Sequence, residues 1–260
     1  RLYKKFYAFI NVSQKAKDYF KQPFMLPLTP SAIIPNAMDS SSFLNCTISE
    51  EELNLVKKQW GIKADDIVFL FLGRIGEEKR VEELLDVCLR VIESNARVKV
   101  MFVGAGPALQ SLERRCRDVS DKVIFTGYVP WNQVHSYYQL GDVFITASLS
   151  EMHSMTIIEA LMSGLPIIAR RDSSFLDTVF PEKNGYLADT DEEMDGYMLS
   201  LADDEKKRLE FSKKSIEISK GFSVETFGAR TVAFYKKILE KFPEKITDSE
   251  LQEAVDSVMI

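Results

Sequence analysis

Cysteine and long apolar runs are scarce in this sequence, and the 33 basic side chains are outnumbered by 39 acidic ones. The three cysteines (Cys46, Cys88 and Cys116) form no CxxC pair, which argues against a disulfide framework and favours free thiols in a reducing compartment. No apolar run approaches the roughly 18 residues of a membrane-spanning helix. The net charge of −6 disfavours DNA or RNA as a partner. A membrane-surface role stays open, because a local basic patch can act against the net balance.

Apolar segments alternate with amphipathic helix patterns through the middle of the chain. Strands are predicted at residues 66–73, 98–104, 122–127, 142–148, 166–170 and 185–188. Helices are predicted after the first four of them, through residues 81–92, 108–119, 131–140 and 155–163. This alternation predicts an α/β fold, a Rossmann-like parallel sheet with helices on both faces.

The two ends of the chain differ from this middle part. Residues 1–38 carry short strand and helix patterns and end at a Pro-Asn break, so we expect the tail of a preceding domain and a linker. Residues 39–242 are expected to form the sheet domain, closed by helices at about 192–219 and 223–242. The polar residues 243–260 are expected to be a peripheral tail. Since the chain opens with Arg and no signal peptide, we expect a fragment of a cytoplasmic protein.

Basic side chains and a helix N-terminus are predicted to meet at the carboxyl edge of the sheet, where open parallel sheets bind ligands. Arg74 follows the first strand, and Lys79 lies in the first turn of the next helix, where the helix dipole disfavours a cation. A later helix begins at Ser154-Met155-Thr156, and its unpaired backbone N–H groups form an anion site. Together these groups could hold a diphosphate. The alternative of two solvated cations paired with nearby glutamates stays open.

Glu151 and Glu159 lie eight residues apart, the first in a loop after a strand and the second in the following helix. Glu159 is suited to accept hydrogen bonds from ribose hydroxyls, and Glu151 would face a sugar or its leaving phosphate. His153 lies between them and is a further candidate for ligand contact. Taken singly, each glutamate is better explained by a solvated surface. Taken together, they favour a site for a sugar joined to a nucleoside diphosphate.

Glycine-rich and acidic motifs elsewhere have plainer interpretations. The segment "GAGP" at 104–107 lacks the third glycine of a dinucleotide fingerprint, so a tight turn is predicted. Tyr128 and Val129 in "GYVP" either lie against a nucleobase or belong to a turn. Asp189 and Asp191 form a D-x-D motif, for which helix capping is the better explanation. No cluster of residues has the spacing of a metal site.

In this order and spacing, several segments resemble family 4 glycosyltransferases of the GT-B fold. The resemblance runs from about Ser31 to Phe242. It rests on "IIPNAMD", "FLGRIGEEKR", "FVGAGP", "VIFTGYVP" and the Glu151-x7-Glu159 motif that leads into "EALMSGLPIIA". The stretch "MTIIEALMSGLPIIAR" is also similar to bacterial transferases that move glucose from UDP-glucose to diacylglycerol.

The resemblance implies that residues 39–242 bind the nucleotide-sugar donor and that residues 1–38 end an acceptor-binding domain. It implies the following donor contacts: Arg74 and Lys79 with the diphosphate, Glu159 with ribose, Glu151 with the sugar and departing phosphate, Tyr128 and Val129 beside the base, and Gly76, His153, Ser154, Met155 and Thr156 in the surrounding loops. Ser154 stands where the family usually has glycine, a departure in the loop that approaches the phosphates. The implied chemistry retains anomeric configuration and needs neither a metal nor a cofactor.

We therefore expect a retaining hexosyltransferase with UDP-glucose as donor and a lipid or glycan as acceptor. Its location would be cytoplasmic, with peripheral contact to the inner face of the membrane left open. Its partners would be the nucleotide sugar, the acceptor and the missing N-terminal domain, without which the chain could bind donor and not turn over. Two alternatives remain: a non-catalytic or partner-dependent nucleotide-binding subunit, and a Rossmann oxidoreductase, against which the missing G-x-G-x-x-G speaks.

Overall fold

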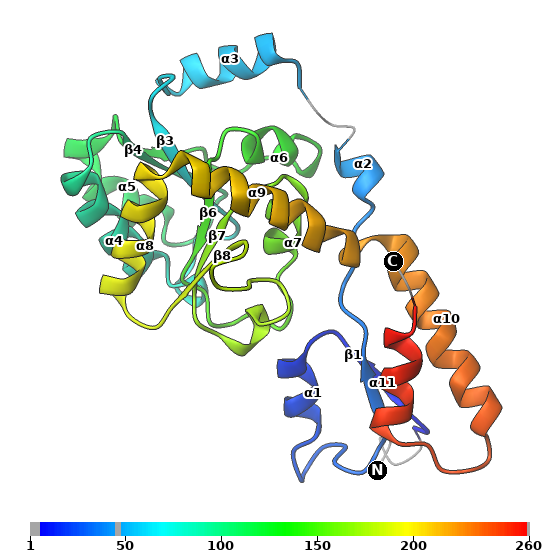
Figure 1. The fold of residues 1–260 in the computed structure, drawn as a ribbon. Coiled ribbons are helices and arrows are strands. Elements are labelled where there is room, and N and C mark those ends of the chain that lie inside the picture. The colour runs from blue at the N-terminus through cyan, green and yellow to red at the C-terminus, as the bar shows by residue number, and fades with distance from the viewer. Residues whose placement is uncertain (1–5, 45–47, 259–260) are drawn as a thin grey trace.

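Six parallel strands form the central sheet, in the order β5-β4-β3-β6-β7-β8 (Figure 1). The computed structural model describes residues 6–44 and 48–258. The strands are β3 (Ile67–Leu72), β4 (Val98–Val103), β5 (Val123–Phe125), β6 (Val143–Thr146), β7 (Ile167–Arg170) and β8 (Gly185–Ala188). The parallel α/β sheet expected from the sequence is confirmed. Because the strand order reverses between β3 and β6, the carboxyl ends of these two strands flank the switch point where such sheets bind ligands.

Helices cover both faces of the sheet, because successive side chains of each strand point to opposite faces. Phe69 and Phe71 of β3 pack on one face with α4 and α8, whereas Val68 and Leu70 pack on the other with α6 and α7. The helices of this domain are α2 (Ser40–Leu44), α3 (Glu50–Gln59), α4 (Val81–Ser94), α5 (Leu109–Arg115), α6 (Trp131–Tyr138), α7 (Met155–Met162), α8 (Asp191–Asp203) and α9 (Glu205–Ser219). Short 3₁₀ turns add η2 (Glu77–Lys79), η3 (Arg117–Val119), η4 (Ser173–Phe175) and η5 (Lys220–Phe222).

The prediction of a single helix at about 192–219 is wrong, because the chain forms two helices there. Asp204 separates α8 from α9 with a non-helical backbone (φ −110°, ψ 88°). Its side chain caps α9 by accepting a 2.9 Å hydrogen bond from the backbone N–H of Lys207. A short aspartate side chain favours this capping role over a place inside a helix, so it ends one helix and starts the next.

A second, smaller core joins the first part of the chain to the last. Its elements are β1 (Phe9–Asn11), α1 (Gln14–Phe20), β2 (Ser31–Ile33), α10 (Val224–Lys241) and α11 (Asp248–Asp256), shown in blue, orange and red in Figure 1. Leu251 and Val255 of α11 are buried with Ala32, Ile34 and Phe234. The expectation that residues 243–260 are peripheral is therefore wrong, because the apolar face of α11 completes this core. We call these elements the small unit.

The cysteines that the structure describes agree with the expected free thiols. Cys88 and Cys116 are buried and unpaired by disulfides. Burial raises the pKa of the Cys88 thiol far above its ordinary value, which keeps it protonated. Cys46 lies outside the described residues. Among residues 6–44 and 48–258, no helix combines the length and apolarity that crossing a bilayer requires.

Candidate functional site

A cavity of about 370 Å³ opens at the carboxyl ends of β3 and β6, at the switch point of the sheet. Seven residues predicted for the site line it: Arg74, Lys79, Glu151, His153, Ser154, Met155 and Thr156. Phe71, Leu72, Gly73 and Thr146 complete its wall. The two cations, the first glutamate and the start of α7 thus share one space, as the pattern of strand ends predicted.

Lys79 and Glu151 form a side-chain ion pair in this cavity. Both are largely shielded, with side-chain exposures of 24% and 18%. The hydroxyl of Ser148 donates a further hydrogen bond to Glu151 Oε1 at 3.2 Å. Arg74 is different, because its side chain is 67% exposed and its Nε lies 3.5 Å from Glu78 Oε1. A ligand can therefore recruit Arg74 with little loss, whereas Lys79 would have to share its charge with Glu151.

The N-terminus of α7 faces the same cavity and carries the N–H groups suited to an anion. Ser154 is the N-cap residue, yet its side chain makes no capping hydrogen bond. Its hydroxyl lies 3.1 Å from that of Thr156 instead. The first N–H groups of any helix lack intrahelical acceptors, and the helix dipole adds partial positive charge there. This helix end can therefore receive phosphate oxygens.

Glycines hold the Arg74 loop in place through close backbone contact. A Cβ atom on Gly104 would lie 1.9 Å from the carbonyl oxygen of Gly73, and one on Gly106 would lie 2.2 Å from that of Ile75. The Ile75 N–H donates to the carbonyl of Ala105 at 3.0 Å, which fixes the register. The glycines of "GAGP" thus admit a neighbouring loop, whereas the turn predicted at 104–107 begins only at Gly106, whose carbonyl accepts from the Leu109 N–H at 3.2 Å.

Glu159 is buried in α7 and does not line the cavity. Its Oε2 accepts a 2.7 Å hydrogen bond from the hydroxyl of Tyr138, which projects from α6. Burial raises the pKa of Glu159, and the Tyr138 hydrogen bond opposes that rise only in part. Burial and the neighbouring Glu159 raise the pKa of Tyr138 as well, so the hydroxyl remains a donor.

His153 lines the cavity, yet its side chain is completely shielded from solvent. Its Nε2 lies 3.3 Å from Oδ2 of Asp177, and its ring lies 5.7 Å from that of Phe222. Neither ring nitrogen makes a hydrogen bond to another described residue. The buried ring packs the loop between Glu151 and α7 against the segment after η4, where it approaches Asp177.

Three further predicted residues lie outside the cavity wall. Gly76 is the N-cap of η2, and its N–H donates to the Arg74 carbonyl at 3.1 Å. Tyr128 is 77% exposed after β5, and Val129 packs on the core beneath α6. Thr146 was missed, although a polar residue at the end of a buried strand next to the switch point was a usable signal. Tyr138 was also missed, and no local pattern marks it as the partner of Glu159.

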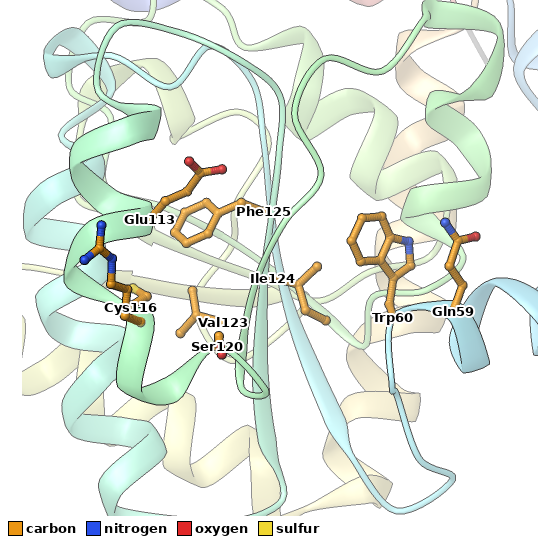
Figure 2. Close-up of a pocket in the computed structure, with 9 residues that line it drawn as sticks. Gln59, Trp60, Glu113, Cys116, Ser120, Val123, Ile124 and Phe125 are labelled. Carbon is orange, nitrogen blue, oxygen red and sulfur yellow. The ribbon is translucent and has the colours of Figure 1, made fainter.

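A larger cavity of about 510 Å³ lies elsewhere, between the end of α3 and the edge strand β5 (Figure 2). Its lining residues are Gln59, Trp60, Glu113, Cys116, Arg117, Ser120, Val123, Ile124 and Phe125. The end of α3 and the end of α5 with η3 precede β3 and β5, so this cavity lies near the amino ends of the strands. Ligands of parallel sheets bind at the opposite edge, and size alone therefore does not make this the site.

The two aspartates of the D-x-D motif pair with arginines. Asp189 lies 2.8 Å from Arg171, and Asp191 forms an ion pair with Arg170. Thr190 between them is the N-cap of α8, and Asp191 begins that helix. Within the part of the chain that the structure describes, no group of three or more His, Cys, Asp and Glu side chains is arranged to hold a metal ion.

Comparisons with known proteins agree with this architecture. The model of the family "Glycosyl transferases group 1" matches residues 54–218. An alpha-monoglucosyldiacylglycerol synthase of Streptococcus pneumoniae is 30% identical over 207 residues, which cover 78% of this chain and 46% of the relative. One from Acholeplasma laidlawii is 26% identical over 216 residues, or 82% of this chain and 54% of the relative. The chain thus spans about half the length of these curated relatives.

Solved structures share the fold. Anabaena HepE in complex with UDP and glucose superposes with a TM-score of 0.74 at 18% identity, covering 87% of this chain and 62% of that one. The pneumococcal O-GlcNAc transferase GtfA in complex with UDP and GlcNAc has a TM-score of 0.70 at 18% identity, covering 91% and 46%. The expected GT-B type of fold is confirmed. By its family match and its similarity to these relatives, this chain belongs to the group 1 glycosyl transferases, the family 4 enzymes that its motifs resemble.

Proposed function

We propose that this chain is the donor-binding part of a retaining glycosyltransferase that moves glucose from UDP-glucose to a lipid acceptor. One observation carries the proposal: Arg74, Lys79, Glu151 and the N-terminus of α7 line a single cavity at the switch point of the sheet. Two cations and the positive end of a helix dipole are electrostatically complementary to the two negative charges of a diphosphate. The carboxylate of Glu151 is then directed toward the sugar side of the ligand.

The chemistry that these groups support is stabilisation of a leaving nucleotide. During transfer, the bond between the anomeric carbon and the β-phosphate oxygen breaks, the acceptor hydroxyl gives its proton to the departing phosphate, and the acceptor oxygen bonds to the same face of the sugar. Negative charge grows on the departing UDP. The α7 N–H groups are already directed at the cavity and would stabilise that charge as preorganised donors, while Lys79 and Arg74 would turn from Glu151 and Glu78 toward the phosphates. Glu159 would accept hydrogen bonds from the ribose after a local adjustment of the Tyr138 contact.

The names of relatives support the finer assignment. Two curated relatives are alpha-monoglucosyldiacylglycerol synthases, and a neighbour in fold is described in complex with UDP and glucose. We therefore favour UDP-glucose over other donors and a lipid over a glycan. A lipid acceptor would place the enzyme at a membrane surface. We further propose that residues 1–38 belong to the acceptor-binding part, and that the rest of that part completes the enzyme.

Isothermal titration calorimetry with UDP, UDP-glucose, GDP-mannose and NAD tests the proposal on the 260-residue chain. UDP and UDP-glucose should bind, and NAD should not. Lys79→Ala removes a charge-assisted contact, so it should weaken UDP binding roughly 10- to 100-fold. Glu159→Ala should weaken it as well. Lys206→Ala serves as the control, because Lys206 is a remote lysine whose side chain is 88% exposed.

Different outcomes separate the alternatives. NAD binding without UDP binding would reject the proposal in favour of a Rossmann oxidoreductase. Binding of UDP-glucose by a full-length protein that never transfers glucose to diacylglycerol vesicles would favour a non-catalytic module. Transfer to a soluble glycan alone would keep the donor site and change the acceptor.

A further inference from the structure

The small unit contacts two loops beside the donor cavity through one partly buried lysine. Lys15 lies in α1, and its Nζ donates to the carbonyl oxygen of Leu149 at 2.9 Å and to Oδ1 of Asp172 at 2.8 Å. The side chains of Lys15 and Asp172 are only 23% and 15% exposed. Helix α1 and turn η4 also pack against each other, below the sheet in Figure 1. A lysine from the small unit thus joins two separate loops of the sheet domain.

The first of these loops leads directly to Glu151. Leu149 precedes Glu151 by two residues, and the hydroxyl of Ser150 between them donates to the Glu78 carbonyl at 2.9 Å. Glu78 in turn precedes Lys79. The loop is therefore held on one side by the turn that carries Lys79 and on the other by Lys15.

The second loop leads to His153. Asp172 is the N-cap of η4, and its Oδ1 accepts from the N–H and hydroxyl of Ser174 at 2.9 and 2.6 Å. The segment after η4 carries Asp177, which faces the buried ring of His153. His153 itself lines the cavity. One contact of Lys15, Leu149, therefore lies two residues from the cavity-lining Glu151. The other, Asp172, caps the turn before Asp177, which contacts the cavity-lining His153.

We infer that Lys15 is a positioning residue of the donor site: it holds the Glu151 loop and η4 in the arrangement that receives a nucleoside diphosphate. This inference rests on the proposed function. It also makes the small unit a contributor to donor binding, although none of its residues lines the cavity. Lys15 does not touch the ligand, so its removal should weaken binding through the geometry of the loop.

Lys17 supplies a matched control. It lies two residues further along α1, and its side chain is 17% exposed. Its Nζ lies 3.1 Å from Oδ2 of Asp248, inside the small unit. Lys15→Met and Lys17→Met therefore remove the same charge from the same helix, and both keep the apolar stem. Only the first change breaks contacts with the sheet domain.

The test is calorimetric titration of the 260-residue chain with UDP, at a temperature where circular dichroism shows each variant to be folded. Lys15→Met should weaken UDP binding about five-fold, a coupling typical of residues outside the ligand contacts. Lys17→Met should bind as the unaltered chain does. Asp172→Asn keeps an oxygen that caps η4 and loses the ion pair, so it should weaken binding in the same direction. Lys15→Arg should restore most of the affinity.

Each result has one meaning. If the unaltered chain binds UDP and Lys15→Met binds it equally well, the inference fails and the proposed function stands. If Lys17→Met weakens binding as much as Lys15→Met, the effect belongs to the small unit in general and the inference fails. If the unaltered chain binds no UDP, the proposed function fails and takes the inference with it. Should Lys15→Met not fold, Asp172→Asn and Lys15→Arg give the same decision.

Discussion

Lys79 and Glu151 neutralise each other across the mouth of the donor cavity, although 72 residues separate them in the sequence. Lys79 lies on η2 after β3, and Glu151 lies after β6, so the pair closes over the switch point of the sheet. An arriving diphosphate competes with Glu151 for the lysine. The ion pair therefore keeps Lys79 in place and at the same time reduces the net gain on binding.

Glu151→Gln should tighten UDP binding. The change removes the carboxylate that competes for Lys79 and the repulsion between that carboxylate and the diphosphate, while the amide oxygen can still accept from Ser148. One charge interaction of this kind in a half-shielded site corresponds to roughly five-fold in affinity. Calorimetry with UDP checks this, with Glu210→Gln as the control, because Glu210 is 63% exposed on α9 and pairs with the remote Lys206. Weaker binding by Glu151→Gln would mean that the carboxylate supports the bound nucleotide directly.

Binding of UDP-glucose should depend on the protonation of Glu159. A carboxylate accepts hydrogen bonds from ribose hydroxyls better than a protonated carboxyl group does. Burial raises the pKa of Glu159 above its ordinary value of 4.5, so affinity should fall as the pH drops through that raised pKa. Titrations between about pH 5 and pH 8 check this, and Glu159→Gln should flatten the curve. A variant that keeps the slope of the unaltered chain would assign the effect to another group.

The raised pKa of Glu159 predicts the opposite pH dependence for the free energy of unfolding. Because the folded state holds the Glu159 proton more tightly than the unfolded state, its contribution to stability is greatest below pH 4.5 and falls as pH rises through the raised pKa. Urea unfolding of the unaltered chain and of Glu159→Gln over the same pH range isolates this contribution as a difference. Equal pH profiles for the two proteins would contradict the raised pKa.

Gly106→Ala should destabilise the Arg74 loop. Its Cβ would meet the Ile75 carbonyl oxygen at 2.2 Å, and relief requires a shift of backbone rather than of a flexible side chain. We expect a loss of about 1–3 kcal/mol in the free energy of unfolding and weaker UDP binding. Gly196→Ala in α8 is the control, since no atom lies within 4 Å of the added Cβ. That change should stabilise the protein by about 0.5–1 kcal/mol, the usual helical preference for alanine. A harmless Gly106→Ala would show that the loop moves freely.

Leu251→Ala should reveal the small core. Leu251 is fully buried between β2 and α10, and removing such a side chain costs about 2–5 kcal/mol. Leu239→Ala on α10 makes a matched comparison, because Leu239 is 76% exposed and its loss should fall within about 0.5 kcal/mol. Urea unfolding monitored by circular dichroism gives both values. Equal, small effects would return α11 to the peripheral role first expected of it.

The strands of the sheet could be predicted from the sequence, because each is a short apolar run that ends in glycine or a polar loop. The convergence of Arg74, Lys79 and the start of α7 could be predicted as well, since parallel strands end at one edge. Contacts that depend on how elements pack could not be predicted from local sequence patterns. The hydrogen bond from Tyr138 to Glu159 requires α6 to lie on α7, and the Lys79–Glu151 pair requires both loops in their final shapes.

Other misses had readable signals. Thr247 and Glu250 form a capping box before α11, and Leu251 and Val255 follow at helical spacing. Ser49 and Glu52 form the same box at the start of α3, a helix that was not predicted. Asp204 failed as a signal for another reason. Aspartate favours the N-cap position, but this region holds several aspartates, and which of them becomes a cap depends on where the two neighbouring helices pack.

The chain crosses between the sheet domain and the small unit twice, and both crossings meet at one point. The N–H of Met38 donates to the carbonyl of Phe222 at 2.9 Å, and Met38 forms a β-bridge with Ser223. Because the two crossing segments are tied together at one point, we expect the sheet domain and the small unit to rotate about that point without separating. Lys15 supplies a second connection between the two bodies through Leu149 and Asp172, away from this point. The distance distribution between spin labels on α10 and α4 should shift or broaden in Lys15→Met, and an unchanged distribution would rule this rotation out.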